Sequence, residues 1–213
     1  AWRGNLALLL PTRKKGGQRH HPAMPFVQVP SFFQDLAELS ALSARALELT
    51  ILTAARTSEV LHARWSEFDL EAAIWTVSAE RMKAGREHRG PLSPAALKLL
   101  TSLQGGHDTL VFPGQAEAKP LSNMSMEMRL RRMKVDHYTV HGFRSSFRDW
   151  VGEVTDFLRE IAEFALAHIV GSATERSYRR GNSFEKRRDL MNAWAAFCLP
   201  AAATASLRHH SQP

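Results

Sequence analysis

Apolar residues recur at intervals of three or four along most of the chain, which is the spacing of one face of a helix. Leu42, Ala46, Leu49 and Leu52 give a clear example. Repeated along the chain, this pattern predicts a mainly helical protein. The predicted helices cover residues 42–53, 57–61, 94–104, 121–134, 142–151, 156–168, 172–180 and 183–198. Ser93, directly before Pro94, is the expected N-cap of the helix at 94–104.

The segment between residues 73 and 92 follows a different pattern. Residues 73–78 are rich in β-branched and aromatic side chains, and residues 89–92 follow a polar turn that contains lysine, glycine and arginine. Two such runs joined by a polar turn favour a hairpin or a small antiparallel sheet. The expected fold class is therefore α+β, mainly helical, with one small antiparallel β-sheet.

The composition is that of a folded protein with an excess of basic residues. Hydrophobic residues make up 44% and charged residues 23% of the 213 residues, both near the average for soluble domains. The apolar run at residues 6–10 is far shorter than the roughly 20 residues of a membrane span, so no membrane partner is expected. The formal net charge of +7 favours a polyanionic partner, most often nucleic acid.

The single cysteine, Cys198, excludes an internal disulfide and any cysteine-rich zinc or iron–sulfur site. It also fits a reducing compartment, so a cytoplasmic location is expected. The sequence contains no GxxxxGK(S/T), HExxH or GxSxG motif, which are the signatures of nucleotide triphosphatases, zinc proteases and serine hydrolases. No metal and no cofactor are expected.

The charge distribution suggests three segments. No acid precedes Asp35, and residues 1–30 are interpreted as a basic, extended linker. The linker is either a disordered end or a strap along a phosphate backbone. A folded domain is expected at residues 31–199, with Ser31 as the N-cap of its first helix. Residues 200–213 are expected to be a disordered tail.

His141 and Arg144 are three residues apart, so at the start of a helix they share one face. Arginine forms two parallel hydrogen bonds to phosphate oxygens. A histidine beside it can donate to the same phosphate or move a proton. The alternative for this pair alone is an arginine in a salt bridge beside a buried structural histidine.

Arg56 ends an apolar helix and precedes Glu59 by three residues. An arginine there needs a partner because desolvating its charge is costly, so Glu59 either organises a binding arginine or forms an ordinary surface ion pair. Lys83 lies in the predicted turn between the strands, where it is either simply solvated or able to reach a leaving oxygen as a general acid. Other cations of this hairpin could exchange roles with it: Arg81, Arg86 and Arg89.

The chain has two tyrosines, Tyr138 and Tyr178. Tyr178 is followed directly by two arginines and lies ten residues after His168. Nearby cations stabilise a phenolate, which suits a tyrosine that acts as a nucleophile. The alternative is an ordinary surface tyrosine near basic residues.

These candidates occur in a recognisable order, which is Arg56, Lys83, His141 with Arg144, His168 and Tyr178. In this order the chain resembles the tyrosine recombinases of the phage integrase family, especially the integrases of bacterial genomic islands and prophages. The resemblance covers residues 31–198 and is carried by RTSEVLHARWSEFDLEAAIWTVSAERMKAGREHRGPLS, TVHGFRSSFRDW, ALAHIVGSATERSYRRG and FEKRRDLMNAWAAFC. No single motif is specific, but chance is a poor explanation for all of them in this order.

The resemblance implies a catalytic domain with a site for the scissile phosphate of double-stranded DNA. Arg56 and Arg144 match the two arginines that bind this phosphate, and Glu59 matches the acid that organises the first of them. His141 matches the histidine that contacts the phosphate and assists proton transfer. His168 matches the position that stabilises the transition state.

The resemblance also implies the reaction. Tyr178 matches the nucleophile that forms a 3′-phosphotyrosyl link, and Lys83 matches the lysine that protonates the departing 5′-oxygen. Because the covalent link retains the bond energy, the family's chemistry uses neither ATP nor a metal. Site-specific DNA integration or recombination is the expected function. Two alternatives are a relaxase like the type IB topoisomerases and a non-catalytic DNA-binding remnant of an integrase.

Integrases of this family also carry an N-terminal arm-binding part and a helical core-binding domain. Neither fits in the 30 residues before Ser31, so this chain is expected to be the catalytic domain with its interdomain linker. The expected partners are the DNA core site, other integrase protomers on that DNA and DNA-bending accessory proteins, so that the protein acts at the bacterial nucleoid. The apolar stripe of the helix at 183–198 packs either on its own core or on a neighbouring protomer, and this helix is expected to take part in assembly on DNA.

Overall fold

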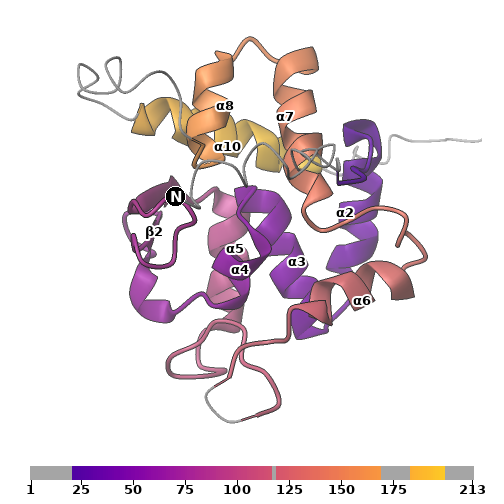
Figure 1. Cartoon of the computed structure of the whole chain (residues 1–213), viewed down its shortest axis with the longest axis vertical. Helices are drawn as coiled ribbons and strands as arrows, with labels where there is room; N and C mark the ends of the chain where they lie inside the picture. The colour runs from indigo at the N-terminus through magenta and orange to yellow at the C-terminus, as the bar shows by residue number, and fades with distance from the viewer. Residues whose placement is uncertain (1–20, 117–118, 169–182, 200–213) are drawn as a thin grey trace, which may run out of the picture.

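The computed structural model describes residues 21–116, 119–168 and 183–199 (Figure 1). The expected helix at 172–180, Tyr178 and the expected tail at 200–213 lie outside the described residues, as do residues 1–20. The described strands are β1 (Phe68–Asp69), β2 (Ile74–Val77) and β3 (His88–Pro91). The described helices are η1 (Phe26–Gln28), α2 (Val29–Ala37), α3 (Leu42–Thr53), α4 (Thr57–Leu61), η2 (Trp65–Glu67), α5 (Pro94–Leu103), α6 (Met124–Arg132), α7 (Gly142–Val154), α8 (Arg159–Ala165) and α10 (Phe184–Cys198).

Helices form the body of the protein, and the small sheet lies at one side of it (Figure 1). α3 runs through the middle and contacts α2, α4, α5, α6 and α10. The strands are antiparallel in the order β1-β2-β3, with Trp75 of β2 opposite Phe68 of β1 and Gly90 of β3. The predicted α+β class, mainly helical with one small antiparallel sheet, is confirmed. The two-residue strand β1 was not predicted because it is too short to show an alternating pattern.

The central position of α3 follows from its sequence, which is apolar on more than one face. Leu47 and Leu49 are 0% exposed and Ile51 is 1% exposed. The predicted helix at 42–53 is confirmed with these bounds. Its C-cap residue, Ala54, adopts a left-handed φ of 49° and so turns the chain sharply toward α4.

The apolar stripe of α10 packs on the core of its own chain. Trp194 and Cys198 are 0% exposed and Met191 is 2% exposed. The indole nitrogen of Trp194 donates a hydrogen bond of 2.8 Å to the backbone oxygen of Ile51 in α3. Of the two positions that the sequence left open for this stripe, the structure therefore shows packing on its own core.

The packed body begins earlier than the sequence predicts. Ser31 is not an N-cap, because α2 begins at Val29 with a proline in its first turn. Met24 is 3% exposed and Val29 is 0% exposed, so apolar residues of the expected linker are part of the core. The sequence did not predict this earlier start of the packed body, because the prolines and basic residues near it are typical of extended chain.

Two predicted helices are markedly shorter in the structure, whereas the helix predicted at 142–151 continues to Val154. The helix predicted at 121–134 is Met124–Arg132, and the one predicted at 156–168 is Arg159–Ala165. Ser93 is confirmed as the N-cap of α5, since its hydroxyl accepts a hydrogen bond of 3.3 Å from the backbone nitrogen of Ala96. A cap with a defined hydrogen bond marks a boundary better than apolar periodicity alone.

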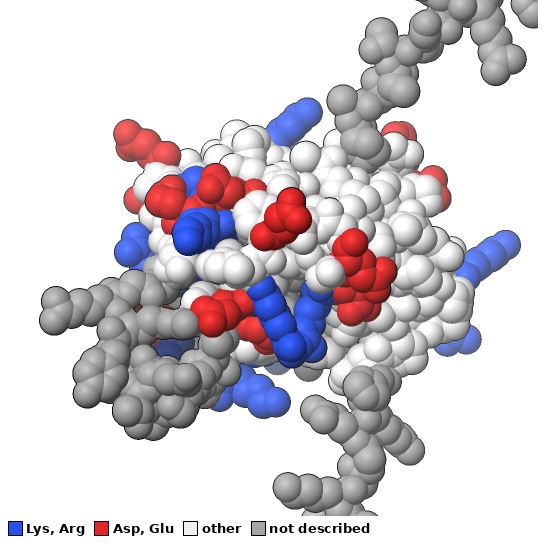
Figure 2. All heavy atoms as spheres, turned by 90° about the horizontal axis from the view of Figure 1, so that it is seen from above, with Lys and Arg blue, Asp and Glu red and all other residues white. Residues whose placement is uncertain are grey.

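The charged side chains are mixed rather than segregated on the face seen in Figure 2. Acidic and basic residues lie side by side there, next to a wide uncharged area. The excess positive charge of the chain is therefore not spread as one continuous surface over this face. Within the described residues, no helix is both long and apolar enough to cross a membrane.

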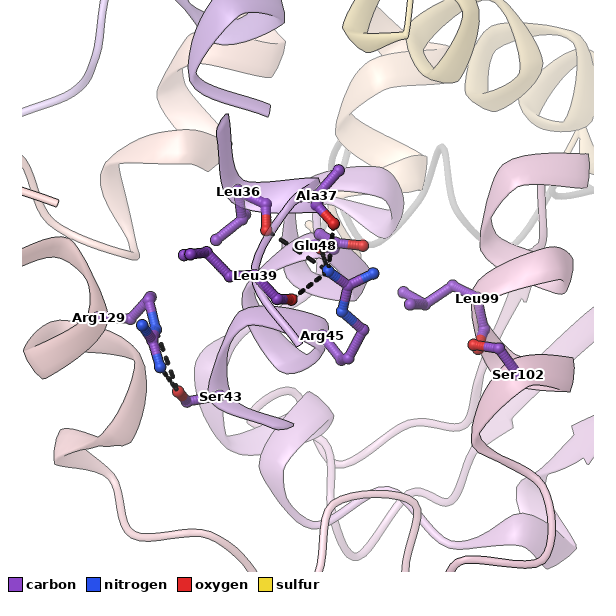
Figure 3. A network of polar contacts seen from close by, with 9 residues as sticks. All are labelled: Leu36, Ala37, Leu39, Ser43, Arg45, Glu48, Leu99, Ser102 and Arg129. Carbon is purple, nitrogen blue, oxygen red and sulfur yellow. Dashed lines mark hydrogen bonds and ion pairs between the residues drawn. The ribbon is translucent and has the colours of Figure 1, made fainter. Parts of the chain in front are cut away.

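A partly buried polar network joins α2 to α3 (Figure 3). Arg45 Nη2 donates to the backbone oxygens of Ala37 (2.8 Å) and Leu39 (2.5 Å), at the end of α2. The same nitrogen lies 2.7 Å from Oε1 of Glu48. Glu48 is only 4% exposed, and burial raises its pKa from 4.5 to about 7 although Arg45 opposes the shift.

Replacing Glu48 by glutamine is expected to reduce the pH dependence of stability between about pH 5 and pH 8. The folded state holds the Glu48 proton more tightly than the unfolded state, so this group stabilises the fold below its unfolded pKa of 4.5 and loses that contribution as the pH rises to about 7. From pH 5 to pH 8, the unfolding free energy of Glu48→Gln should therefore rise by about 1–3 kcal/mol relative to that of the wild type. Urea unfolding at both pH values measures this change.

Glu38→Gln is the matched control, because Glu38 is exposed at the end of α2. Its pH profile should follow that of the wild type. An unchanged profile for Glu48→Gln would contradict the raised pKa.

Candidate active site

Arg56 lies between α3 and α4, where the chain turns after Ala54. Its guanidinium contacts Oε1 of Glu59 at 2.8 Å, and its backbone nitrogen donates to Oε2 of the same carboxylate at 2.9 Å. Glu59 is 4% exposed, whereas the Arg56 side chain is 18% exposed. A buried acid thus holds Arg56 in one position while part of the Arg56 side chain stays accessible.

Arg144 lies in the first turn of α7 and is 5% exposed. Its Nη1 donates to the backbone oxygen of Ala54, and its Nη2 donates to the backbone oxygen of Leu166 at 2.7 Å. Nη2 also lies 3.1 Å from Nε2 of His168. Burial, followed by the nearby charge of Arg56, lowers the pKa of Arg144 to about 10, which leaves it positively charged at neutral pH.

His141 precedes α7 as its N-cap residue and is exposed. Desolvation lowers its pKa to about 4, and the neighbouring charges of Arg144, His21, Arg56 and His168 add to this shift. At neutral pH the imidazole is therefore uncharged and able to accept a proton. The side chains of Arg56, Arg144 and His168 therefore lie close enough to His141 to influence its pKa.

The start of α7 requires glycine at position 142. A Cβ atom there would lie 2.2 Å from the backbone oxygen of Pro22, which is shorter than any van der Waals contact. The backbone nitrogen of Thr139 donates to that oxygen at 3.0 Å, and the His21 ring lies 4.5 Å from the His141 ring between centroids. The close approach therefore places residues 21–22 against the His141 side of the site.

His168 lies directly after the turn that ends α8, with its side chain 41% exposed. Its Nε2 faces Arg144 and its Nδ1 lies 2.6 Å from Oε2 of Glu163. Arg144 thus contacts a histidine 24 residues away in the sequence, a contact that the sequence did not predict. Glu163 was not among the predicted residues, because no motif marks it.

Lys83 lies in the loop between β2 and β3 and is exposed. It makes no ion pair with any other described residue. Arg81, in contrast, donates to the backbone oxygen of Glu59 at 2.6 Å and to the side chain of Glu67. These contacts hold Arg81 in place and connect the start of the loop to α4. Arg81 is therefore a poorer candidate than Lys83 for the general acid, which has to reach a leaving oxygen.

The accessible part of the site is an open hollow of about 330 Å³ lined by Arg56, Thr57, Ser58, Asn123 and His141. A separate, smaller cavity includes Glu59, Arg144 and His88 in its lining. Burial and the charge of Arg187 lower the pKa of His88 to about 4. The neutral His88 ring was not predicted, because its place in a strand beside the arginines depends on the fold.

The described structure therefore brings together Arg56, Glu59, His141, Arg144 and His168. Two fixed guanidinium groups and two imidazoles converge there while Glu59 and Glu163 hold Arg56 and His168 in place, an arrangement with the chemistry to bind an anion. Lys83 stands on the neighbouring loop. Tyr178 lies outside the described residues.

Comparison with known proteins places this geometry in a family context. Residues 23–183 match the phage integrase family. The integrase of Enterobacteria phage P4 is 34% identical over 203 residues, which cover 84% of this chain and 46% of that protein. Prophage integrase IntZ of Escherichia coli (strain K12) is 33% identical over 195 residues, which cover 90% of this chain and 48% of that protein. The chain thus spans about half the length of these curated relatives.

Solved structures share the fold. A lambda integrase (75–356) dimer bound to a COC′ core site matches with a TM-score of 0.52 and 22% identity, covering 76% of this chain and 60% of that chain. XerA recombinase matches with a TM-score of 0.54 and 16% identity, covering 89% of this chain and 71% of that chain. With most of its length matched to one family and its fold found among solved recombinases, the chain belongs to the phage integrase family.

Proposed function

We propose that this chain cleaves and rejoins DNA strands through Tyr178, as the catalytic part of a site-specific tyrosine recombinase. The observation that carries the proposal is the convergence of Arg56, Arg144, His141 and His168 on one site. Their mutual electrostatic effects appear in the lowered pKa values of Arg144 and His141. Two fixed guanidinium groups suit a phosphodiester better than any other group of DNA.

The proposed reaction is an attack by the Tyr178 oxygen on a backbone phosphorus. The new bond joins tyrosine to the 3′-phosphate, and the bond from phosphorus to the 5′-oxygen breaks. The phenol proton passes to the neutral His141, and Lys83 gives a proton to the 5′-oxygen. Extra negative charge develops on the phosphoryl oxygens in the transition state, where Arg56 and Arg144 stabilise it.

The phosphate also explains why a histidine with a lowered pKa serves as the proton acceptor. Positive neighbours contribute to the low pKa of His141, and a bound phosphate offsets their charge. The pKa of His141 therefore rises when DNA is bound, and the histidine becomes a better proton acceptor.

Related proteins support recombination over simple relaxation as the outcome. The relatives are called integrases, and one solved neighbour is a lambda integrase tetramer bound to a Holliday junction, with a TM-score of 0.53 and 17% identity. By analogy, the proposed partners are double-stranded core-site DNA and further protomers on it, with DNA-bending proteins as accessory factors. The proposed place of action is the bacterial nucleoid.

The experiment is the capture of the covalent intermediate. The protein is mixed with nicked duplexes whose sequence is randomised around the nick, and a denaturing gel is searched for a protein–DNA band. We expect a band for the wild type and its loss in Tyr178→Phe, because phenylalanine has no nucleophilic oxygen.

Tyr138→Phe is the matched control. The Tyr138 hydroxyl donates to Oε1 of Gln28 at 3.2 Å and has no part in the proposed reaction, so its band should remain. A band that survives in Tyr178→Phe would refute the assignment of the nucleophile. DNA binding without a band in any variant would favour the non-catalytic remnant.

A further inference from the structure

We propose that Glu163 is a positioning residue that fixes the tautomer and the ring orientation of His168. Its consequence for DNA cleavage rests on the proposed function, whereas its consequence for the His168 ring does not. Glu163 lies in α8, outside every motif by which the sequence pointed to the site.

The first observation is a chain of hydrogen bonds through the imidazole. Arg144 Nη2 lies 3.1 Å from His168 Nε2, and His168 Nδ1 lies 2.6 Å from Glu163 Oε2. A guanidinium only donates hydrogen bonds, so Nε2 must accept and carries no proton. The ring proton is then on Nδ1, where the carboxylate of Glu163 accepts it.

The second observation is that the backbone joins the same two residues. The backbone nitrogen of His168 donates to the oxygen of Glu163 at 2.9 Å, and that of Ala167 donates to Phe164 at 3.1 Å. Ala167 has a left-handed φ of 52°. These features are a Schellman motif, in which residues five apart are linked across the end of a helix. The side-chain bond closes a second link between the same residues, so the ring has little freedom to turn.

The third observation is that Glu163 is itself held and charged. Nε of Arg148 lies 2.8 Å from Oε1, and Nε of Arg159 lies 3.8 Å from it. Burial opposes ionisation of Glu163, but the hydrogen bond from His168 and the charges of Arg148 and Arg159 outweigh it, so the pKa is lowered. Arg148 follows Arg144 by one turn of α7, so a single helix supplies the arginine that contacts the ring and the arginine that holds its support.

The consequence concerns the atom that His168 offers to a phosphate. With Nδ1 bonded to Glu163, Nε2 is the ring atom on the Arg144 side, and it must take up a proton before it can donate to a phosphoryl oxygen. A histidine without such a partner exchanges between tautomers and ring orientations. Glu163 thereby keeps the His168 ring in one orientation before the reaction, so the ring does not have to reorient to stabilise the transition state.

The direct test needs no DNA. In protein labelled with 15N at histidine, the His168 signals are assigned by their loss in His168→Asn, and the nitrogen shifts report which ring nitrogen is protonated. The wild type should show the Nδ1-protonated form at neutral pH. Glu163→Leu and Glu163→Ala should lose it, because a ring that Glu163 no longer holds can turn away from Arg144 and exchange between tautomers. Glu163→Gln should keep it, because an amide oxygen still accepts from Nδ1. Glu153→Leu, a change to an exposed carboxylate of α7, should leave the signals unchanged.

Retention of the Nδ1-protonated form in folded Glu163→Leu or Glu163→Ala would overturn the proposal.

The second test measures cleavage. Loss of an orienting partner of this kind reduces activity by about tenfold to a hundredfold, so Glu163→Leu and Glu163→Ala should form the covalent adduct that much more slowly. Their DNA affinity should be retained, and Glu163→Gln should be largely active. If the tautomer changes and cleavage does not, the catalytic part of the proposal is wrong. If the wild type forms no adduct, the proposed function fails while the NMR result still decides the positioning role.

Discussion

Replacing Arg144 by alanine is expected to slow formation of the covalent DNA adduct by on the order of 100- to 1,000-fold, the usual effect of removing one fixed donor from a transition state. Arg144 contacts the backbone of Ala54 and Leu166 and the ring of His168. It thus connects the end of α3 with the end of α8, and its loss should also let His168 move away from the phosphate.

The same substitution should lower stability. The carbonyl oxygens of Ala54 and Leu166 lose their donor in a site where Arg144 is only 5% exposed, and each buried acceptor left unpaired costs about 1–3 kcal/mol. Urea unfolding measures this loss, and single-turnover cleavage at a temperature where the variant is folded measures the rate.

Lys98→Ala provides the control for charge, because Lys98 is an exposed cation of α5. It should change neither stability nor cleavage. Adduct formation at the wild-type rate in folded Arg144→Ala would show that this arginine is structural, which is the alternative that the sequence left open.

Replacing Trp194 by alanine is expected to destabilise the fold by about 3–5 kcal/mol. Trp194 is 0% exposed and packs against Phe147, Trp150 and Phe197 at centroid distances of 5.1 to 5.7 Å. The cavity left by alanine would lie where α10 meets α7, and the backbone oxygen of Ile51 would lose its hydrogen bond. Urea denaturation followed by circular dichroism measures the loss.

Trp194→Phe separates the two contributions, since it keeps an aromatic ring and removes the indole nitrogen. It should cost less than alanine. Equal stability of Trp194→Ala and the wild type would contradict the packing of α10 on its own core.

The packing of α10 on its own core limits which variants can test its expected role in assembly on DNA. A chain that ends at Gly181 lacks Leu190, Met191, Trp194 and Cys198, all of them at most 2% exposed. Such a truncation removes part of the core, so it would confuse folding with assembly. Substitutions at exposed positions of α10, such as Asn192 and Ala196, test the expected role in assembly without that effect.

Local sequence signals predicted what depends on neighbours along the chain. The helix at Leu42–Thr53 follows from apolar periodicity, the start of α5 from the Ser93 cap, and the ion pair of Arg56 with Glu59 from a spacing of three residues. In each case the interacting groups are less than two turns apart. Chain connectivity alone then brings them together.

The tertiary structure decided contacts between distant segments and the boundaries that such contacts set. Arg144 meets Ala54 across 90 residues, and Trp194 meets Ile51 across 143 residues. Because Met24 and Val29 pack into the core, the folded body begins before Ser31, although the residues there are typical of extended chain.

The sequence by itself determined the fold class, the family and the order of the candidate residues. Only the tertiary structure decided that Arg144 is buried, that His141 is uncharged at neutral pH, and that Glu163 supports His168. The physical reason is that burial and electrostatic coupling depend on which groups surround a side chain in space, and no local pattern of residues encodes those neighbours.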